Sequence, residues 1–228
     1  MSESKQDINI LESDLMSIYI QELYSLCEGI NRECEEIFKE ATVSSDHNTM
    51  SVSPVLHNRI YSVLIYAANI KKLAFPVRHK KAKEKTATYK LRNQRADLFE
   101  KILENVSIKE IHNNKVRNTL EHFDEYLDEA NVVLNTEHKK RKLAEEHGYA
   151  AYNLSLSRWN VFDRKIYPIR VYIAEEKTFY NLKWSIDIGK IDSEARAILD
   201  CINALELSKE KKSGGLLIPL IDKQLLNN

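Results

Sequence analysis

Apolar residues recur at every third or fourth position through the first two thirds of the chain. The clearest repeat, between residues 14 and 40, runs through Leu15, Ile18, Leu23, Cys27, Ile30, Cys34 and Ile37. This spacing places one apolar stripe along a helix, so it predicts a helix over residues 14–40 that packs against a core. Gly29 is the single glycine among the first 145 residues, which also favours long helices because glycine is a poor helix former.

Two more helices are predicted from their start and stop signals. Ser53 is a typical N-cap and Pro54 suits the first helical position. The apolar residues that follow indicate a helix that ends before Pro76, because the residue before a proline disfavours helical geometry. A third helix is predicted over about residues 84–104, with apolar positions at Leu91, Leu98, Phe99 and Ile102.

A fourth helix is predicted over residues 116–134, after Ser107–Glu110, which has the spacing of a capping box. On a helical wheel its apolar and polar residues separate. The stripe that should face the core comprises Val116, Leu120, Phe123, Leu127, Ala130 and Leu134. The opposite face comprises Arg117, Asn118, Glu121, His122 and Glu125. We therefore expect His122 to be exposed rather than part of the core.

The pattern changes from helical to alternating after Gly148. Alternation over about residues 152–156, 169–173 and 178–186 predicts two or three antiparallel strands. Asp192 is expected to begin a final helix, which ends near residue 205 and is followed by an apolar tail.

These elements predict a mainly α (α+β) protein. Residues 1–147 should form an up-down helical bundle, and residues 148–228 a small antiparallel β appendage with a returning C-terminal helix and tail.

Composition indicates an intracellular protein. The chain has 3 cysteines and a polar, acidic start that is unlike a signal peptide, so we expect a reducing, cytoplasmic location. Its most apolar run, residues 61–70, is too short to cross a bilayer, so no membrane association is expected. Cys27 and Cys34 lie on the apolar stripe and should be buried thiols. The histidines are scattered and no nucleotide-binding or nucleophile motif is present, so we expect neither a metal nor a cofactor.

Charge is balanced overall but unevenly distributed. Acidic and basic residues number 34 each, which gives a formal net charge of zero. Residues 71–95 and 139–142 are strongly basic, whereas residues 1–50 are acidic. Basic segments attract polyanions such as RNA, but they are equally common on solvated helix faces. Both interpretations stay open at this point.

Arg117 and His122 raise the question of catalysis. In the ordinary interpretation, Arg117 pairs with Glu121 at a spacing of four residues on the helix surface, and His122 has no chemical role. In the catalytic interpretation, the imidazole takes or gives a proton near neutral pH, and the guanidinium binds a phosphate. The spacing of Arg117 and His122 alone favours the ordinary interpretation.

The stretch RNTLEHFDEYLDE, residues 117–129, resembles the signature helix of the HEPN superfamily. That signature is an arginine, a polar residue and then a histidine, which Arg117, Asn118 and His122 match with four residues between arginine and histidine. The preceding long helix and the predicted helical bundle agree with this resemblance.

The resemblance implies a metal-independent endoribonuclease in which a ribose 2′-hydroxyl attacks the adjacent phosphate. Arg117 is then expected to bind the phosphate, His122 to act as acid or base, and Asn118 to support them. The motif helices of two subunits are expected to meet in a homodimer, and RNA is the expected substrate. The resemblance also implies a role in phage defence or as a toxin. An antitoxin or another protein is then an expected partner. The alternative, which the acidic residues around His122 favour, is a non-catalytic dimerisation or protein-interaction module of the same fold.

Overall fold

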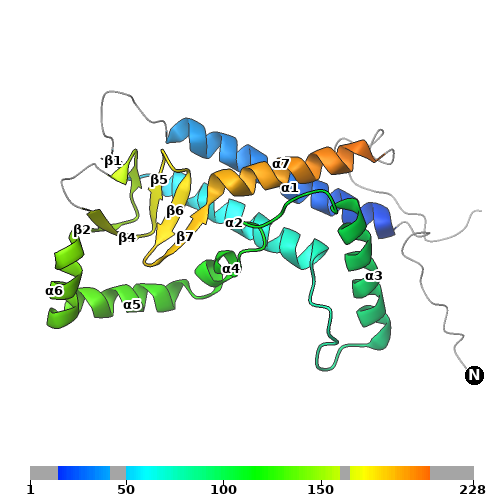
Figure 1. Ribbon diagram of the computed structural model, residues 1–228, viewed down its shortest axis with the longest axis horizontal. Coiled ribbons are helices and arrows are strands. Elements are labelled where there is room, and N and C mark those ends of the chain that lie inside the picture. Colours follow the sequence, from blue (N-terminus) through cyan, green and yellow to red (C-terminus); the bar gives the residue numbers. More distant parts are fainter. Residues whose placement is uncertain (1–14, 42–49, 160–164, 206–228) are drawn as a thin grey trace, which may run out of the picture.

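The computed structural model describes residues 15–41, 50–159 and 165–205, without the side chains of Leu15, Val116, Arg117 and Leu120. The helices are α1 (Leu15–Glu40), α2 (Pro54–Ala74), α3 (Thr86–Ile102), α4 (Asn114–Glu121), α5 (Phe123–Asn135), α6 (Glu137–Glu146) and α7 (Ile188–Ala204). The strands are β1 (Met50–Ser51), β2 (His147–Tyr152), β3 (Ser155–Leu156), β4 (Lys165–Ile169), β5 (Val171–Ile173), β6 (Thr178–Asn181) and β7 (Trp184–Asp187). The described residues are therefore mainly helical with a small β component, as predicted (Figure 1).

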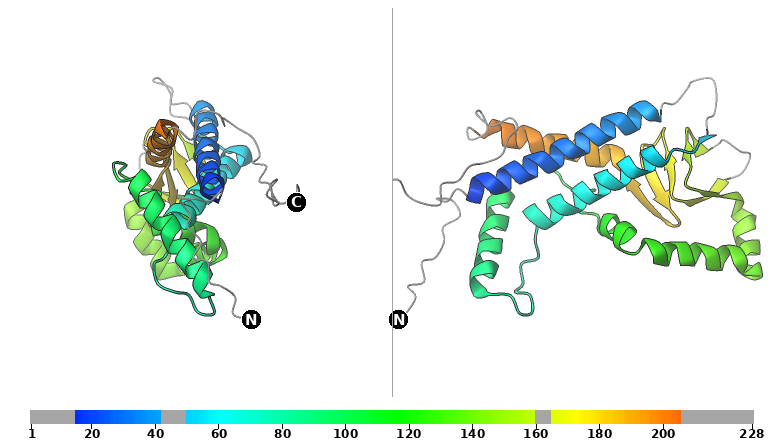
Figure 2. Two further views of the ribbon diagram at one scale, coloured as in Figure 1. Left: turned by 90° about the vertical axis from the view of Figure 1, so that its right-hand side faces the viewer. Right: turned by 180° about the vertical axis from the view of Figure 1, so that it is seen from behind.

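The core lies where α1, α2 and α7 pack along one another (Figures 1 and 2). Both α2 and α7 run opposite to α1. The predicted apolar stripe of α1 is buried here, together with residues of α2 and α7; fully buried members are Leu23, Ile30, Ile37, Ile60, Leu64, Ile191 and Ile198. One core thus contains residues from both sides of the predicted boundary after residue 147.

The first three helices confirm the sequence signals to within a few residues. Ser53 is the N-cap of α2, and its side chain accepts a hydrogen bond from the backbone N–H of Leu56 at 3.1 Å. Cys27 and Cys34 are buried in the core, as expected. The apolar tail predicted after residue 205 lies outside the described residues.

The start of the last helix was wrongly predicted at Asp192. The N-cap of α7 is Asp187, whose Oδ1 accepts from the backbone N–H of Lys190 at 2.8 Å. Asp192 lies inside the helix, where it pairs with Arg196 at 3.1 Å. The earlier start is favoured because it buries Ile188 as well as Ile191.

The β region is mixed rather than antiparallel, which corrects the prediction. One sheet has the strand order β1-β3-β5-β6-β7, and β3 and β5 in it are parallel; a second, two-stranded sheet pairs β2 with β4 in parallel. The chain passes through β4 between β3 and β5, so β5 returns in the same direction as β3.

The residues predicted as one strand over 178–186 form a hairpin of β6 and β7. The turn is made at Leu182, which has a positive φ of 54° and is buried. Alternation continues through both strands, so the pattern alone does not mark the turn.

Two arginines of the basic segment 71–95 form ion pairs within the molecule. Arg92 is buried and forms two hydrogen bonds with the Glu84 carboxylate, from Nε at 3.0 Å and from Nη2 at 2.7 Å. Arg78 pairs with Asp97 and, at 2.8 Å, with Glu100 on α3. These arginines hold α3 against the loop that precedes it, so they are not a free basic surface.

Within the described ranges, every helix is too short or too polar to span a bilayer.

Candidate functional site

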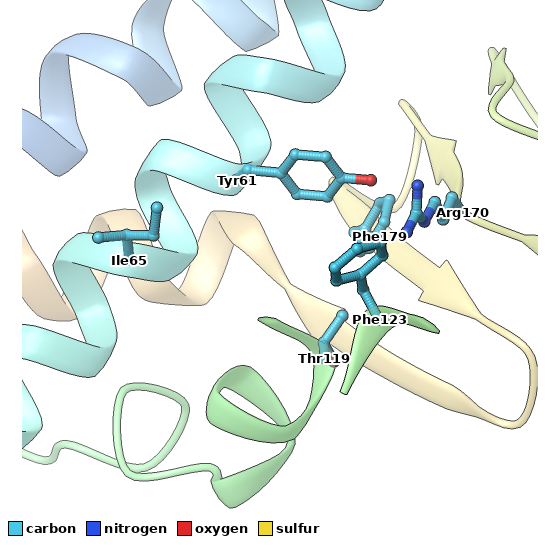
Figure 3. Close-up of a pocket in the computed structure, with 6 residues that line it drawn as sticks. All are labelled: Tyr61, Ile65, Thr119, Phe123, Arg170 and Phe179. Atoms are coloured by element: carbon cyan, nitrogen blue, oxygen red, sulfur yellow. The ribbon is translucent and has the colours of Figure 1, made fainter. Parts of the chain in front are cut away.

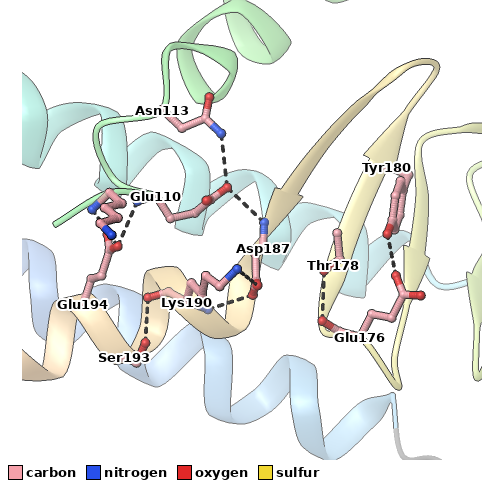
Figure 4. Close-up of polar contacts among 10 residues, drawn as sticks. Glu110, Asn113, Glu176, Thr178, Tyr180, Asp187, Lys190, Ser193 and Glu194 are labelled. Carbon is pink, nitrogen blue, oxygen red and sulfur yellow. Dashed lines mark hydrogen bonds and ion pairs between the residues drawn. The ribbon is translucent and has the colours of Figure 1, made fainter. Parts of the chain in front are cut away.

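The segment before α4 is fixed by a carboxylate from α7. Glu194 Oε1 accepts from the backbone N–H of Glu110 at 2.8 Å (Figure 4) and from that of Lys109 at 2.7 Å. Glu194 Oε2 accepts from the backbone N–H of Ile111 at 2.9 Å. Three consecutive N–H groups therefore converge on one charged group, which sets the direction in which the chain enters α4.

The capping box predicted at Ser107–Glu110 does not form. Asn113 is the N-cap of α4, and its side chain accepts from the backbone N–H of Lys115 at 3.0 Å. The Glu110 carboxylate instead accepts from the backbone N–H of Asp187 and from Asn113 Nδ2, each at 3.2 Å (Figure 4). Glu110 thus joins the start of α4 to the start of α7 and cannot turn back toward Ser107.

The single helix predicted over residues 116–134 is two helices, α4 and α5, that meet at His122. His122 has φ −123° and ψ 35°, outside helical geometry. The physical reason is that the two parts of the apolar stripe have different partners. α4 packs against α2, whereas Ala130 on α5 packs with Ile169 and Leu182 of the β region.

Breaking the helix moves one residue off the predicted core stripe. Phe123, the first residue of α5, has 53% of its surface exposed. Ala130 is buried and Leu127 and Leu134 are partly buried, as the wheel predicted.

The predicted polar face of this region is exposed where the structure describes its side chains. The side chains of Asn118, Glu121, His122 and Glu125 are exposed, which confirms the wheel for these residues. Arg117 lies on α4, but its side chain is outside the described set. The structure also places the Glu125 side chain beside the His122 ring. The sequence predicted that these two residues share the polar face, but it did not predict this contact.

His122 and Glu125 form a close pair. His122 Nδ1 lies 3.0 Å from Glu125 Oε1, and the two side chains are 48% and 72% exposed. A carboxylate only accepts, so the shared proton of this hydrogen bond belongs to Nδ1 and, in a neutral ring, Nε2 is the nitrogen able to accept a proton. This is the geometry of a general base that is oriented by an acid residue.

Acidic side chains dominate the rest of the α5 surface. The exposed carboxylates here are Asp124, Glu125, Asp128 and Glu129. Lys183 partly balances them, with Nζ 3.6 Å from Glu129 Oε1. On the neighbouring α6, Arg141 of the basic run 139–142 pairs with Glu137 at 2.7 Å.

A pocket of about 350 Å³ opens beside the junction of α4 and α5. It is lined by Tyr61 and Ile65 of α2, Thr119 of α4, Phe123 of α5, Arg170 between β4 and β5, and Phe179 of β6 (Figure 3). Sequence reasoning did not find this pocket, because its walls come from segments far apart in the chain.

Comparisons with models of known protein families, with curated proteins and with solved structures find no match to this chain. The HEPN resemblance therefore stays a prediction that rests on the chain's own residues. Among the described residues, no three His, Cys, Asp or Glu side chains gather in a way that would hold a metal ion.

Proposed function

We propose that this protein is a metal-independent, HEPN-like endoribonuclease that acts as a homodimer through α4. The observation that carries the proposal is the exposed His122 at the α4–α5 junction, with its Nδ1 held by Glu125. An oriented imidazole on an exposed surface suits proton transfer to or from a large substrate.

The proposed reaction is intramolecular transesterification of RNA. The ribose 2′-oxygen attacks the adjacent phosphorus, and its proton passes to Nε2 of one His122. The bond from phosphorus to the 5′-oxygen breaks, and that oxygen leaves with a proton from the second His122 of the dimer. Arg117 binds the phosphate oxygens and Asn118 supports the pair, so the products are a 2′,3′-cyclic phosphate and a 5′-hydroxyl.

Cleavage of labelled RNA in the presence of a chelator tests the proposal. We expect His122→Ala to lower the cleavage rate by roughly a hundredfold or more, the usual contribution of a general acid or base. His138→Ala is the matched control, because His138 is also an exposed histidine but lies on α6. Absence of cleavage by the parent protein, or equal rates in the parent and His122→Ala, overturns the proposal.

Glu125→Gln separates positioning from chemistry. Since Glu125 contacts the ring and not the substrate, we expect this variant to lower kcat with little change in KM. An unchanged kcat, or a rise in KM with kcat unchanged, contradicts the positioning role.

A second function, a non-catalytic dimerisation or protein-interaction module, is favoured by the exposed carboxylates of α5, because they repel a phosphate backbone. Light scattering on the parent and on Arg117→Glu tests it. Loss of the dimer in the variant, together with absence of RNA cleavage by the parent, supports this second function over the first.

The proposed role in phage defence or as a toxin follows from the HEPN resemblance. Growth arrest of cells that produce the parent protein, but not His122→Ala, is the expected result.

A further inference from the structure

The pocket beside the α4–α5 junction has the size and the walls of a small-molecule site. Its volume of about 350 Å³ falls in the range of ligand pockets. Three aromatic rings, those of Tyr61, Phe123 and Phe179, line it from three different elements (Figure 3). Aromatic walls favour a flat, aromatic ligand, because offset and edge-to-face ring contacts add to the burial of apolar area.

Arg170 places one positive charge in this apolar wall. Its guanidinium carbon lies 5.8 Å from the ring centre of Tyr61 and 5.5 Å from that of Phe123. No carboxylate among the described residues pairs with Arg170, whereas Arg59 pairs with two and Arg92 with one. A guanidinium only donates hydrogen bonds, so the group it lacks is an anionic acceptor.

The backbone of Arg170 adopts an unusual conformation, and contacts with neighbouring residues hold it in place. Its φ is 56°, in the left-handed region that is uncommon for residues other than glycine. The buried His57 contacts the Arg170 carbonyl oxygen through Nε2 at 3.0 Å and the Ser53 carbonyl oxygen through Nδ1 at 3.0 Å. Strained backbone held by its surroundings is a feature of ligand sites.

The hydroxyl of Tyr61 is a second polar group in the pocket that could bind a ligand. Tyr61 Oη is buried and has no hydrogen-bond partner among the described residues, and Figure 3 shows it pointing toward Arg170 and Phe179. Burial raises the pKa of Tyr61, so the phenol keeps its proton and is a donor. The remaining lining hydroxyl, that of Thr119, already donates to the Lys115 carbonyl oxygen at 2.7 Å.

We propose that this pocket binds a small aromatic molecule that carries one anionic group, with its rings between Tyr61, Phe123 and Phe179 and its anion on Arg170. A carboxylate or a sulfonate on an aromatic ring has this chemistry. The proposal is independent of RNA cleavage, because none of the lining residues belongs to the proposed catalytic group.

Two fluorescent probes with the same ring system test the proposal on the full chain. Anilinonaphthalenesulfonate carries the anion, and phenylnaphthylamine lacks it. We expect the parent protein to bind the sulfonate more tightly than the neutral probe. Arg170→Asn should weaken sulfonate binding about tenfold or more, the loss expected for a hydrogen bond to a charged group, and leave the neutral probe unchanged. Asparagine is chosen because it tolerates positive φ.

Two further variants keep the result interpretable. Arg158→Asn is the matched control, because Arg158 pairs with Glu175 and does not line the pocket. Ile65→Trp fills the pocket from a residue that is 47% exposed, so the fold is expected to tolerate it, and both probes should lose binding. Equal affinity for the two probes in the parent, or unchanged sulfonate binding in Ile65→Trp, overturns the proposal.

Discussion

Replacing Glu194 by glutamine tests the physical account of how α4 is positioned. The carboxylate accepts three backbone N–H groups, from Lys109, Glu110 and Ile111. In glutamine, one oxygen becomes an NH₂ group, which cannot accept from Ile111 and turns its own hydrogens toward that N–H. The remaining two hydrogen bonds lose the help of the negative charge.

The size of the effect can be worked from these contacts. A hydrogen bond to a charged group contributes about 1.5–3 kcal/mol. Because Glu194 is only partly buried, solvent reduces this figure, and we expect a loss of roughly 1–3 kcal/mol in the free energy of unfolding. For a chain of this size, that loss lowers the melting temperature by roughly 2–12 °C.

Thermal unfolding followed by circular dichroism gives the global effect. Hydrogen exchange at Lys109, Glu110 and Ile111 gives the local one, and their amides should exchange faster in Glu194→Gln. Asp200→Asn is the control, because Asp200 is an exposed acid on the same helix and loses the same charge. If Glu194→Gln melts at the temperature of the control and its three amides keep their protection, the carboxylate does not hold the segment and the reasoning is refuted.

Two further predictions concern acid stability and thiol reactivity. The hydrogen bond from Arg92 lowers the pKa of Glu84 from 4.5 to about 2. The pair therefore stabilises the fold above pH 4.5, and this contribution is lost as the pH falls toward 2. In urea unfolding, Glu84→Gln should lose less stability than the parent between pH 4.5 and pH 2. Burial raises the pKa of the Cys27 and Cys34 thiols, so both should react slowly with iodoacetamide in the folded protein. Mass spectrometry should count one added group in the native protein, at Cys201, and 3 after denaturation. Rapid modification of Cys27 in the native protein would contradict its burial.

The local signals were sufficient for the long helices of the core. The stripe of α1 and the Ser53–Pro54 start of α2 depend on residues within a few positions of each other, and both predictions are confirmed. The start of α7 was placed too late because Asp187 and Asp192 are both acceptable caps, and only tertiary burial of Ile188 distinguishes them.

Turns in the β region could not be predicted for a different reason. Arg170 and Leu182 adopt positive φ, although neither is a typical turn residue. Each is held by tertiary contacts: His57 binds the Arg170 carbonyl, and Leu182 is buried beside Ala130 of α5. No local pattern carries that information.

Some features of the candidate site follow from local sequence, and others depend on tertiary contacts. Exposure of His122 followed from the helical wheel, because amphipathic periodicity is local. The break at His122 did not, since it depends on α4 and α5 having different partners. The pocket depends on five segments that meet only in the folded chain.

The Glu194 contacts also bear on the order in which the protein is made. Lys109 and Glu194 are 85 residues apart, so a ribosome synthesises α4 long before it synthesises the carboxylate that fixes the entry to that helix. Domains form as their segments emerge, and long-range contacts form last. During translation, α4 is therefore without its anchor until Glu194 has been synthesised. The entry to α4, and with it the position of His122 at the end of α4, is fixed only after α7 has been synthesised.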